Sequence, residues 1–267
     1  MSTTLDQTRA TTLSSISPEL VRGGNFYVWM AVACIVVSVA GFAPTYWLPL
    51  ATGAFMDRGP LVNLHGALFA AWPFFFLWQT WLAAQGRLEH HQASGVAGVS
   101  LATAMVVIGV ATGIGNMLHR IAEGDGDMAR AFSVVLLTTI ALFGVLVAVA
   151  VANVKRPDVH KRVMLVASIS ILQAAVDRIY YLLVVGGKFG VPLGFTPTPP
   201  VVASVPGALI TDLLVAAAMV YDWRTRGRPH PAYLIAGAVL LFVQLIRVPL
   251  GPSPQWLEFT HFLAGFG

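Results

Sequence analysis

The stretch VVLLTTIALFGVLVAVAVA, residues 134–152, decides the class of fold. It contains no charged residue and is long enough to cross the hydrocarbon core of a bilayer as an α-helix. The rest of the 267-residue chain has a similar composition, with 57% hydrophobic and 10% charged residues, which is too apolar for a water-soluble domain of this size. The composition therefore predicts an integral membrane protein.

Further apolar runs of similar length recur along the chain. Backbone groups find no water to bond in lipid, so runs of this length must be helices. The fold predicted is an all-α polytopic membrane bundle of seven transmembrane helices. Their predicted ranges are 27–50, 61–84, 94–117, 130–154, 160–186, 203–222 and 231–250.

The distribution of basic residues predicts the orientation of the bundle. If the N-terminus is cytoplasmic, the loops on that side collect Arg9, Arg22, Arg87, Lys155, Arg156, Lys161, Arg162, Arg224, Arg226 and Arg228. The opposite loops hold Arg58, Arg120, Arg130 and Lys188 among several acidic residues. The positive-inside rule then predicts a cytoplasmic N-terminus and a periplasmic C-terminus. Basic residues confined to short loops also argue against nucleic-acid binding.

The two ends of the chain differ from the predicted transmembrane domain, residues 23–250. Residues 1–22, rich in Ser and Thr, predict a disordered cytoplasmic tail. Residues 251–267 carry aromatic and aliphatic side chains at helical spacing, which predicts an interfacial helix. Between these ends, the proline-rich stretch from Gly190 to Pro206 is expected to form an irregular outer loop.

Four ionisable residues, Asp177, Arg178, Asp212 and Arg247, lie within the apolar runs. A charge near the bilayer centre costs about 2.5–3.5 kcal/mol, so such side chains normally face a protein interior and find partners there. From depth and charge we expect Asp177 to pair with Arg247 near Gln244, and Arg178 to pair with Asp212. Such pairs either fix the order of helices or form a ligand or proton site, and the sequence leaves both open.

Helical spacing groups several other polar side chains on common faces. His65, Trp72 and Gln79 are seven residues apart and share one face of the second span. The fifth span presents Ser170, Gln173, Asp177 and Tyr181 on one face, and the third span presents Thr112, Asn116 and His119. We therefore expect a polar pocket in the outer half of the bundle.

Histidines near both ends of the spans suggest a redox cofactor, because neutral imidazole is a common ligand of haem iron. His65 and His119 are the candidate ligands of a b-type haem on the outer side, in a pocket shaped by Trp72, Gln173 and Asp177. A second pair on the cytoplasmic side would combine His160 with His90 or His91. At helix ends such histidines can equally cap a helix or meet lipid headgroups.

Three segments carry a resemblance to known proteins: AGFAPTYWLPL (40–50), LHGALFAAWPFFFLWQTWLAAQGRLEHH (64–91) and DVHKRVMLVASIS (158–170). They resemble a group of uncharacterised multi-pass bacterial inner-membrane proteins, with a weaker similarity to b-type membrane cytochromes. The resemblance implies a location in the bacterial inner membrane but brings no activity with it. One departure is Gln92, where the group is expected to have a basic residue.

Three functions follow as expectations from these residues. The first is a haem-binding or redox-linked membrane protein. The second is a transporter of a small solute or a proton-coupled permease, with Asp177 and Asp212 as titrating groups. The third is a sensor or scaffold whose polar core only specifies helix packing. The lipid bilayer is the expected partner, together with further copies of the chain or other membrane subunits.

Overall fold

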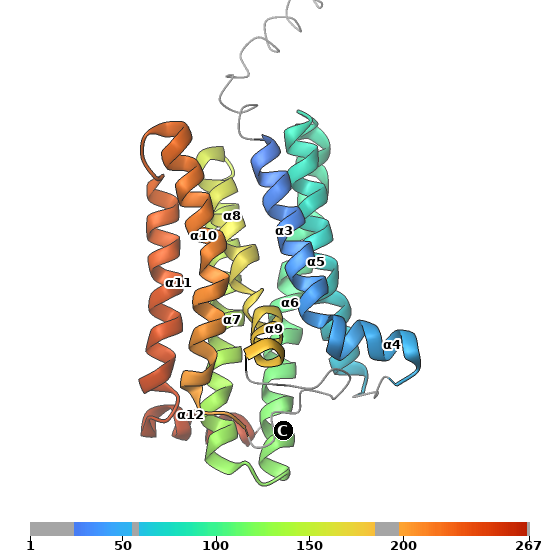
Figure 1. The fold of residues 1–267 in the computed structure, drawn as a ribbon, viewed down its shortest axis with the longest axis vertical. Helices are drawn as coiled ribbons and strands as arrows, with labels where there is room; N and C mark the ends of the chain where they lie inside the picture. Colours follow the sequence, from blue (N-terminus) through green and yellow to red (C-terminus); the bar gives the residue numbers. More distant parts are fainter. Residues whose placement is uncertain (1–23, 55–58, 185–197, 266–267) are drawn as a thin grey trace, which may run out of the picture.

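The computed structural model describes residues 24–54, 59–184 and 198–265, and all the secondary structure in these ranges is helical (Figure 1). The predicted tail over residues 1–22 and much of the predicted outer loop lie outside these ranges. The helices are α3 (Gly24–Phe42), η1 (Ala43–Trp47), α4 (Leu48–Thr52), α5 (Pro60–Ala84), α6 (Leu88–Ala122), α7 (Gly126–Ala152), α8 (Pro157–Ser170), α9 (Gln173–Val184), η2 (Val201–Ser204), α10 (Val205–Arg226), α11 (Pro231–Leu250) and α12 (Pro254–Ala264).

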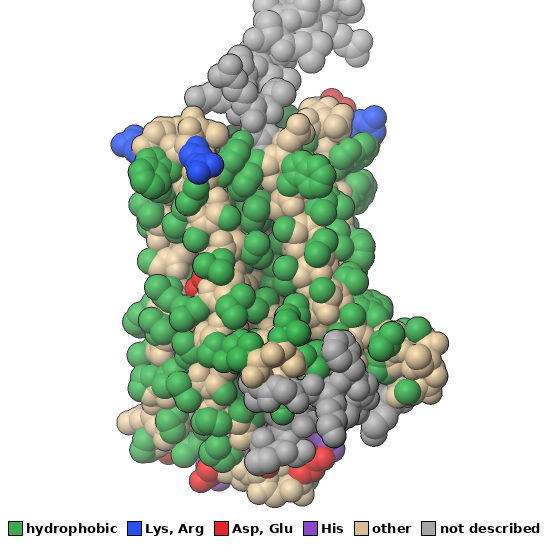
Figure 2. Space-filling view, viewed as in Figure 1, with side chains coloured by type: hydrophobic (Ala, Val, Ile, Leu, Met, Phe, Trp, Pro, Cys, Tyr) green, Lys and Arg blue, Asp and Glu red, His purple; other side chains and the backbone are tan. Residues whose placement is uncertain are grey.

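The long helices run side by side as a bundle, and their outward surface is dominated by hydrophobic side chains (Figures 1 and 2). Within the described ranges, six helices are long and apolar enough to cross a membrane. The count becomes seven if α8 and α9, which meet at a 41° bend, form one broken span. The prediction of an all-helical bundle of apolar helices is thus confirmed.

The predicted fifth span, residues 160–186, is not continuous. α8 ends at Ser170 and α9 begins at Gln173, while the Leu172 amide bonds back to the Ile169 carbonyl. The Ser170 hydroxyl donates to the Ala167 carbonyl, which is the local competition by which serine weakens a helix. The break places the start of α9, and the polar residues that follow, inside the bundle.

Prolines shift two other predicted boundaries. The first span, predicted over 27–50, ends as an α-helix at Phe42; a π-helical turn containing Pro44 follows, and then the short α4, which projects from the bundle (Figure 1). The outer loop predicted as far as Pro206 ends earlier, because η2 begins at Val201 and α10 includes Pro206. Proline has no amide hydrogen and is tolerated in the first turn of a helix, where that hydrogen would lack a partner.

The closest approach of α3 to α9 depends on Gly41. A Cβ at this position would lie 2.4 Å from the Ala175 carbonyl oxygen, which is backbone and cannot rotate away. We expect Gly41→Ala to lower the free energy of unfolding by about 1–3 kcal/mol, as overpacking does. Gly95→Ala is the matched control, because a Cβ there meets nothing within 4 Å. Unfolding in detergent measured by circular dichroism would show the difference; equal stabilities would contradict the packing.

Candidate functional site

Arg247, near the end of α11, is the centre of a buried polar cluster. Its side chain is 1% exposed. Nε donates to the Thr138 hydroxyl at 2.7 Å, Nη2 to the Thr139 hydroxyl at 2.9 Å and Nη1 to Gln173 Oε1 at 2.9 Å. All three partners are neutral side chains of α7 and α9. Their dipoles therefore stabilise the charge of the buried guanidinium.

Gln173, the first residue of α9, connects Arg247 to an acid. Its amide nitrogen donates to the Ser204 carbonyl at 3.0 Å and more weakly to Asp177 Oδ2 at 3.4 Å. The other carboxylate oxygen of Asp177 is buried against Gly207, where a Cβ would lie 1.7 Å away. The predicted grouping of Gln173 with Asp177 on one face is therefore present.

Neither ion pair predicted from depth is among the ion pairs of the described residues, although Arg247 acts electrostatically on both Asp177 and Asp212. Gln173 lies between Asp177 and Arg247. Asp212 instead accepts a hydrogen bond from Gln244 at 3.1 Å. Arg178 donates to the Ala174 carbonyl and lies 4.4 Å from the ring of Phe42.

The polar face predicted on α5 lies largely inside the bundle. Trp72 and Gln79 are buried, and their side chains donate to Ser168 Oγ at 3.2 Å and Ser94 Oγ at 2.7 Å. His65 is half-buried and stacks on Phe69 with ring centres 4.1 Å apart. Its Nδ1 is buried without a hydrogen-bond partner.

The outer histidine pair is not brought into contact. The His119 side chain is 65% exposed and lies 3.3 Å from Glu123 at the end of α6, and no contact joins it to His65 in the described structure. Of the face predicted on the third span, Thr112 is buried, whereas Asn116 and His119 are exposed. The end of α6 therefore directs these last two side chains away from the interior.

The cytoplasmic-side histidines behave differently. His91 near the start of α6 and His160 near the start of α8 lie with ring centres 6.3 Å apart and ring planes at 88°. Nδ1 of His91 bonds the Gln79 carbonyl at 3.2 Å, and Nδ1 of His160 bonds the Ala150 carbonyl at 2.8 Å. A carbonyl can only accept, so each Nδ1 donates its hydrogen, and in a neutral ring Nε2 is then the nitrogen that can accept or bind a metal. His90, the neighbour of His91, is exposed.

A second polar cluster at this end of the bundle was not predicted. Arg162 forms two hydrogen bonds of 2.7 Å to Asp222, and both side chains are 2% exposed. Next to it, His230 Nε2 lies 2.9 Å from Asp158, while Nδ1 accepts from the Ala232 amide. Burial and the charge of Arg162 lower the pKa of His230 from its ordinary value.

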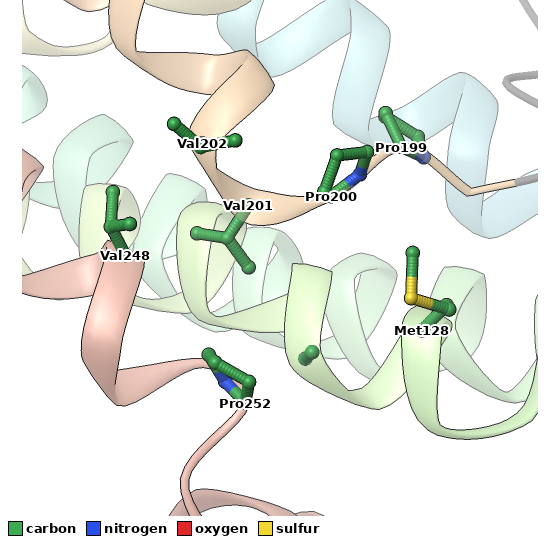
Figure 3. Close-up of a pocket in the computed structure, with 8 residues that line it drawn as sticks. Met128, Pro199, Pro200, Val201, Val202, Val248 and Pro252 are labelled. Carbon is green, nitrogen blue, oxygen red and sulfur yellow. The ribbon is translucent and has the colours of Figure 1, made fainter.

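An apolar hollow of about 180 Å³ lies between the starts of α7 and η2 and the end of α11 (Figure 3). It is lined by Met128, Ala131, Pro199, Pro200, Val201, Val202, Val248 and Pro252. None of the predicted polar residues lines it. Within the described ranges, no group of three or more His, Cys, Asp or Glu side chains could hold a metal ion. Comparison with protein-family models, with curated proteins and with solved structures finds no match to this chain.

Proposed function

We propose that the chain crosses the bacterial inner membrane seven times, with α8 and α9 as one broken span, the N-terminus in the cytoplasm and the C-terminus in the periplasm. The six long apolar helices and the bent pair support this count. In Figure 2, the visible Lys and Arg side chains lie at one end of the bundle, together with an acidic side chain, and most of the visible Asp and Glu lie at the other end. That asymmetry supports a cytoplasmic location for the basic end, which includes the starts of α6 and α8.

Within this frame, we propose that the protein is redox-active and binds a b-type haem between His91 and His160. The observation that carries the proposal is the pair of imidazoles 6.3 Å apart, each braced through Nδ1 by a backbone carbonyl. Histidines that ligate metals almost always donate their other ring hydrogen to a carbonyl or carboxylate. At about 2.0–2.1 Å per metal–nitrogen bond, two Nε2 ligands of one ion place their ring centres roughly 6 Å apart.

The surroundings of the pair also suit a haem. Haem carries two propionate carboxylates, which favour cations and water. Arg87 precedes α6 by one residue, and Lys155 and Arg156 precede α8, so that cations surround both helix starts. The apolar spans below would hold the ring in hydrocarbon. A haem here would place a one-electron carrier at the cytoplasmic side of the bilayer.

The absorbance spectrum of the purified protein tests the proposal. We expect a Soret band that shifts on reduction with dithionite, and one haem per chain on extraction, because His91 and His160 would together hold one haem. Protein isolated without haem should bind added haemin with the same stoichiometry. Absence of a Soret band before and after haemin addition would end the proposal, as would metal analysis that finds one copper or zinc per chain and no haem.

A further inference from the structure

Asp212 lies at the edge of the face of α10 that packs in the bundle: Ala208 and Val215, one turn away on either side, are buried, and Gln244 of α11 contacts it. The nearby side chains of Leu209, Ile210 and Leu213 are 44%, 44% and 64% exposed. Asp212 itself is half-buried. In a bilayer the carboxyl group of Asp212 would therefore lie at the boundary between protein and lipid.

If Asp212 is a carboxylate, a buried acceptor beside it lacks a hydrogen bond. If Asp212 is a carboxylic acid, its own hydrogen can satisfy that acceptor. Gln244 Nε2 donates to Asp212 Oδ1 at 3.1 Å. Gln244 Oε1 is buried, in a residue only 2% exposed, and has no donor. Leaving a buried acceptor unsatisfied costs about 1–3 kcal/mol. A protonated Asp212 supplies the missing donor, so that acid and amide exchange two hydrogen bonds.

Asp212 has no cation as a direct partner among the residues that the structure describes. Arg247 of α11 is the charged side chain that acts on it from a neighbouring helix, and its hydrogen bonds go to Thr138, Thr139 and Gln173. Arg247 also acts electrostatically on Asp177 of α9, which accepts a hydrogen bond from Gln173. Among the described residues, no Lys, Arg or His forms an ion pair with Asp212. A partly buried carboxyl group without a paired cation has a lower free energy in its neutral, protonated form than as a carboxylate.

We infer that Asp212 is a proton-binding site, held as a carboxylic acid that donates to Gln244 Oε1 and reached from the lipid. This site is independent of the proposed haem, which lies at the other end of the spans. An apolar carbodiimide dissolved in the bilayer is the reagent suited to such an acid. The acid O–H adds across one C=N bond: its proton goes to nitrogen, its oxygen bonds the central carbon, and the acyl group then moves from oxygen to nitrogen. The product is a stable N-acylurea, and no atom is lost.

Chemical labelling followed by peptide mass spectrometry tests whether Asp212 is reached from the lipid and whether it is protonated. With dicyclohexylcarbodiimide in proteoliposomes, we expect the adduct on Asp212, loss of the adduct in Asp212→Asn, and retention in Asp177→Asn. A water-soluble carbodiimide should label Asp212 much less. Adduct that is absent from Asp212, or that the water-soluble reagent forms equally well, would overturn the inference.

The stability of two variants gives a second readout. Asn at 212 can still donate an N–H to Gln244 Oε1, whereas Leu cannot. We expect Asp212→Asn to keep the thermal midpoint of the native protein and to remove one protonated-carboxyl C=O band from the infrared spectrum. We expect Asp212→Leu to lower the midpoint. If Asn destabilises as much as Leu, or if the band persists in Asp212→Asn, Asp212 is not the acid.

Discussion

Replacing His91 or His160 by alanine is expected to abolish the spectrum of a six-coordinate haem. With one imidazole removed, the iron keeps at most one protein ligand and becomes high-spin or leaves during purification. The two replacements should have equal effects, because Nδ1 of each ring is hydrogen-bonded to a backbone carbonyl in the same way. The Soret position, the dithionite difference spectrum and electron paramagnetic resonance would measure the change.

His90→Ala and His119→Ala are the matched controls. His90 adjoins His91 in sequence but is exposed, and His119 lies exposed beside Glu123. Both variants should keep a native haem spectrum at one haem per chain. If instead His119→Ala and His65→Ala lose the haem while His91→Ala keeps it, the iron is held by the outer pair and the cytoplasmic assignment is wrong.

Replacing Asp222 by Asn is expected to produce a large loss of stability. Arg162 and Asp222 are both 2% exposed and joined by two hydrogen bonds of 2.7 Å, so the variant leaves a buried guanidinium without its counter-ion. Breaking one side of such a pair costs about 3–5 kcal/mol. Reversible unfolding in mixed micelles, followed by circular dichroism, would report it.

Asp158→Asn controls for the change in charge, because the Asp158 side chain is 47% exposed and its partner is His230. An exposed pair contributes about 0–1 kcal/mol, so this variant should be nearly native. The double variant Arg162→Met with Asp222→Leu should recover most of the stability lost in Asp222→Asn, since no charge is then left buried. Equal losses for Asp222→Asn and Asp158→Asn would show that burial does not govern this pair.

The sequence was sufficient to predict the helices but not how their polar side chains pair. Apolar runs define spans by length alone, and prolines at 44, 49 and 206 moved only their ends. Which side chains bond to Arg247 depends on how α7 and α9 are rotated and at what depth they lie, with the precision of a hydrogen-bond length. The spacing of residues along a single helix does not give that information. From its charge, Arg247 was predicted to pair with a carboxylate. Its hydrogen bonds go instead to two threonines and a glutamine.

The Arg162–Asp222 pair was missed for a related reason. Arg162 follows a histidine and a lysine at the start of a span, which is the pattern of an interfacial basic cluster. The available signal was Asp222, an acid within the last turns of an apolar helix, where it needs a buried partner. The cytoplasmic histidines, by contrast, were predicted as a pair, and the structure brings His91 and His160 together because α5, α6 and α8 all have an end at that face of the bundle.

The length of α6 has a consequence for access from water. Its 35 residues extend about 52 Å at 1.5 Å per residue, against a hydrocarbon core of about 30 Å. Fitting that length inside the core would need a tilt well beyond the range of about 0–40° found for transmembrane helices. In a bilayer, several turns of α6 would therefore lie outside the hydrocarbon core, where water reaches them.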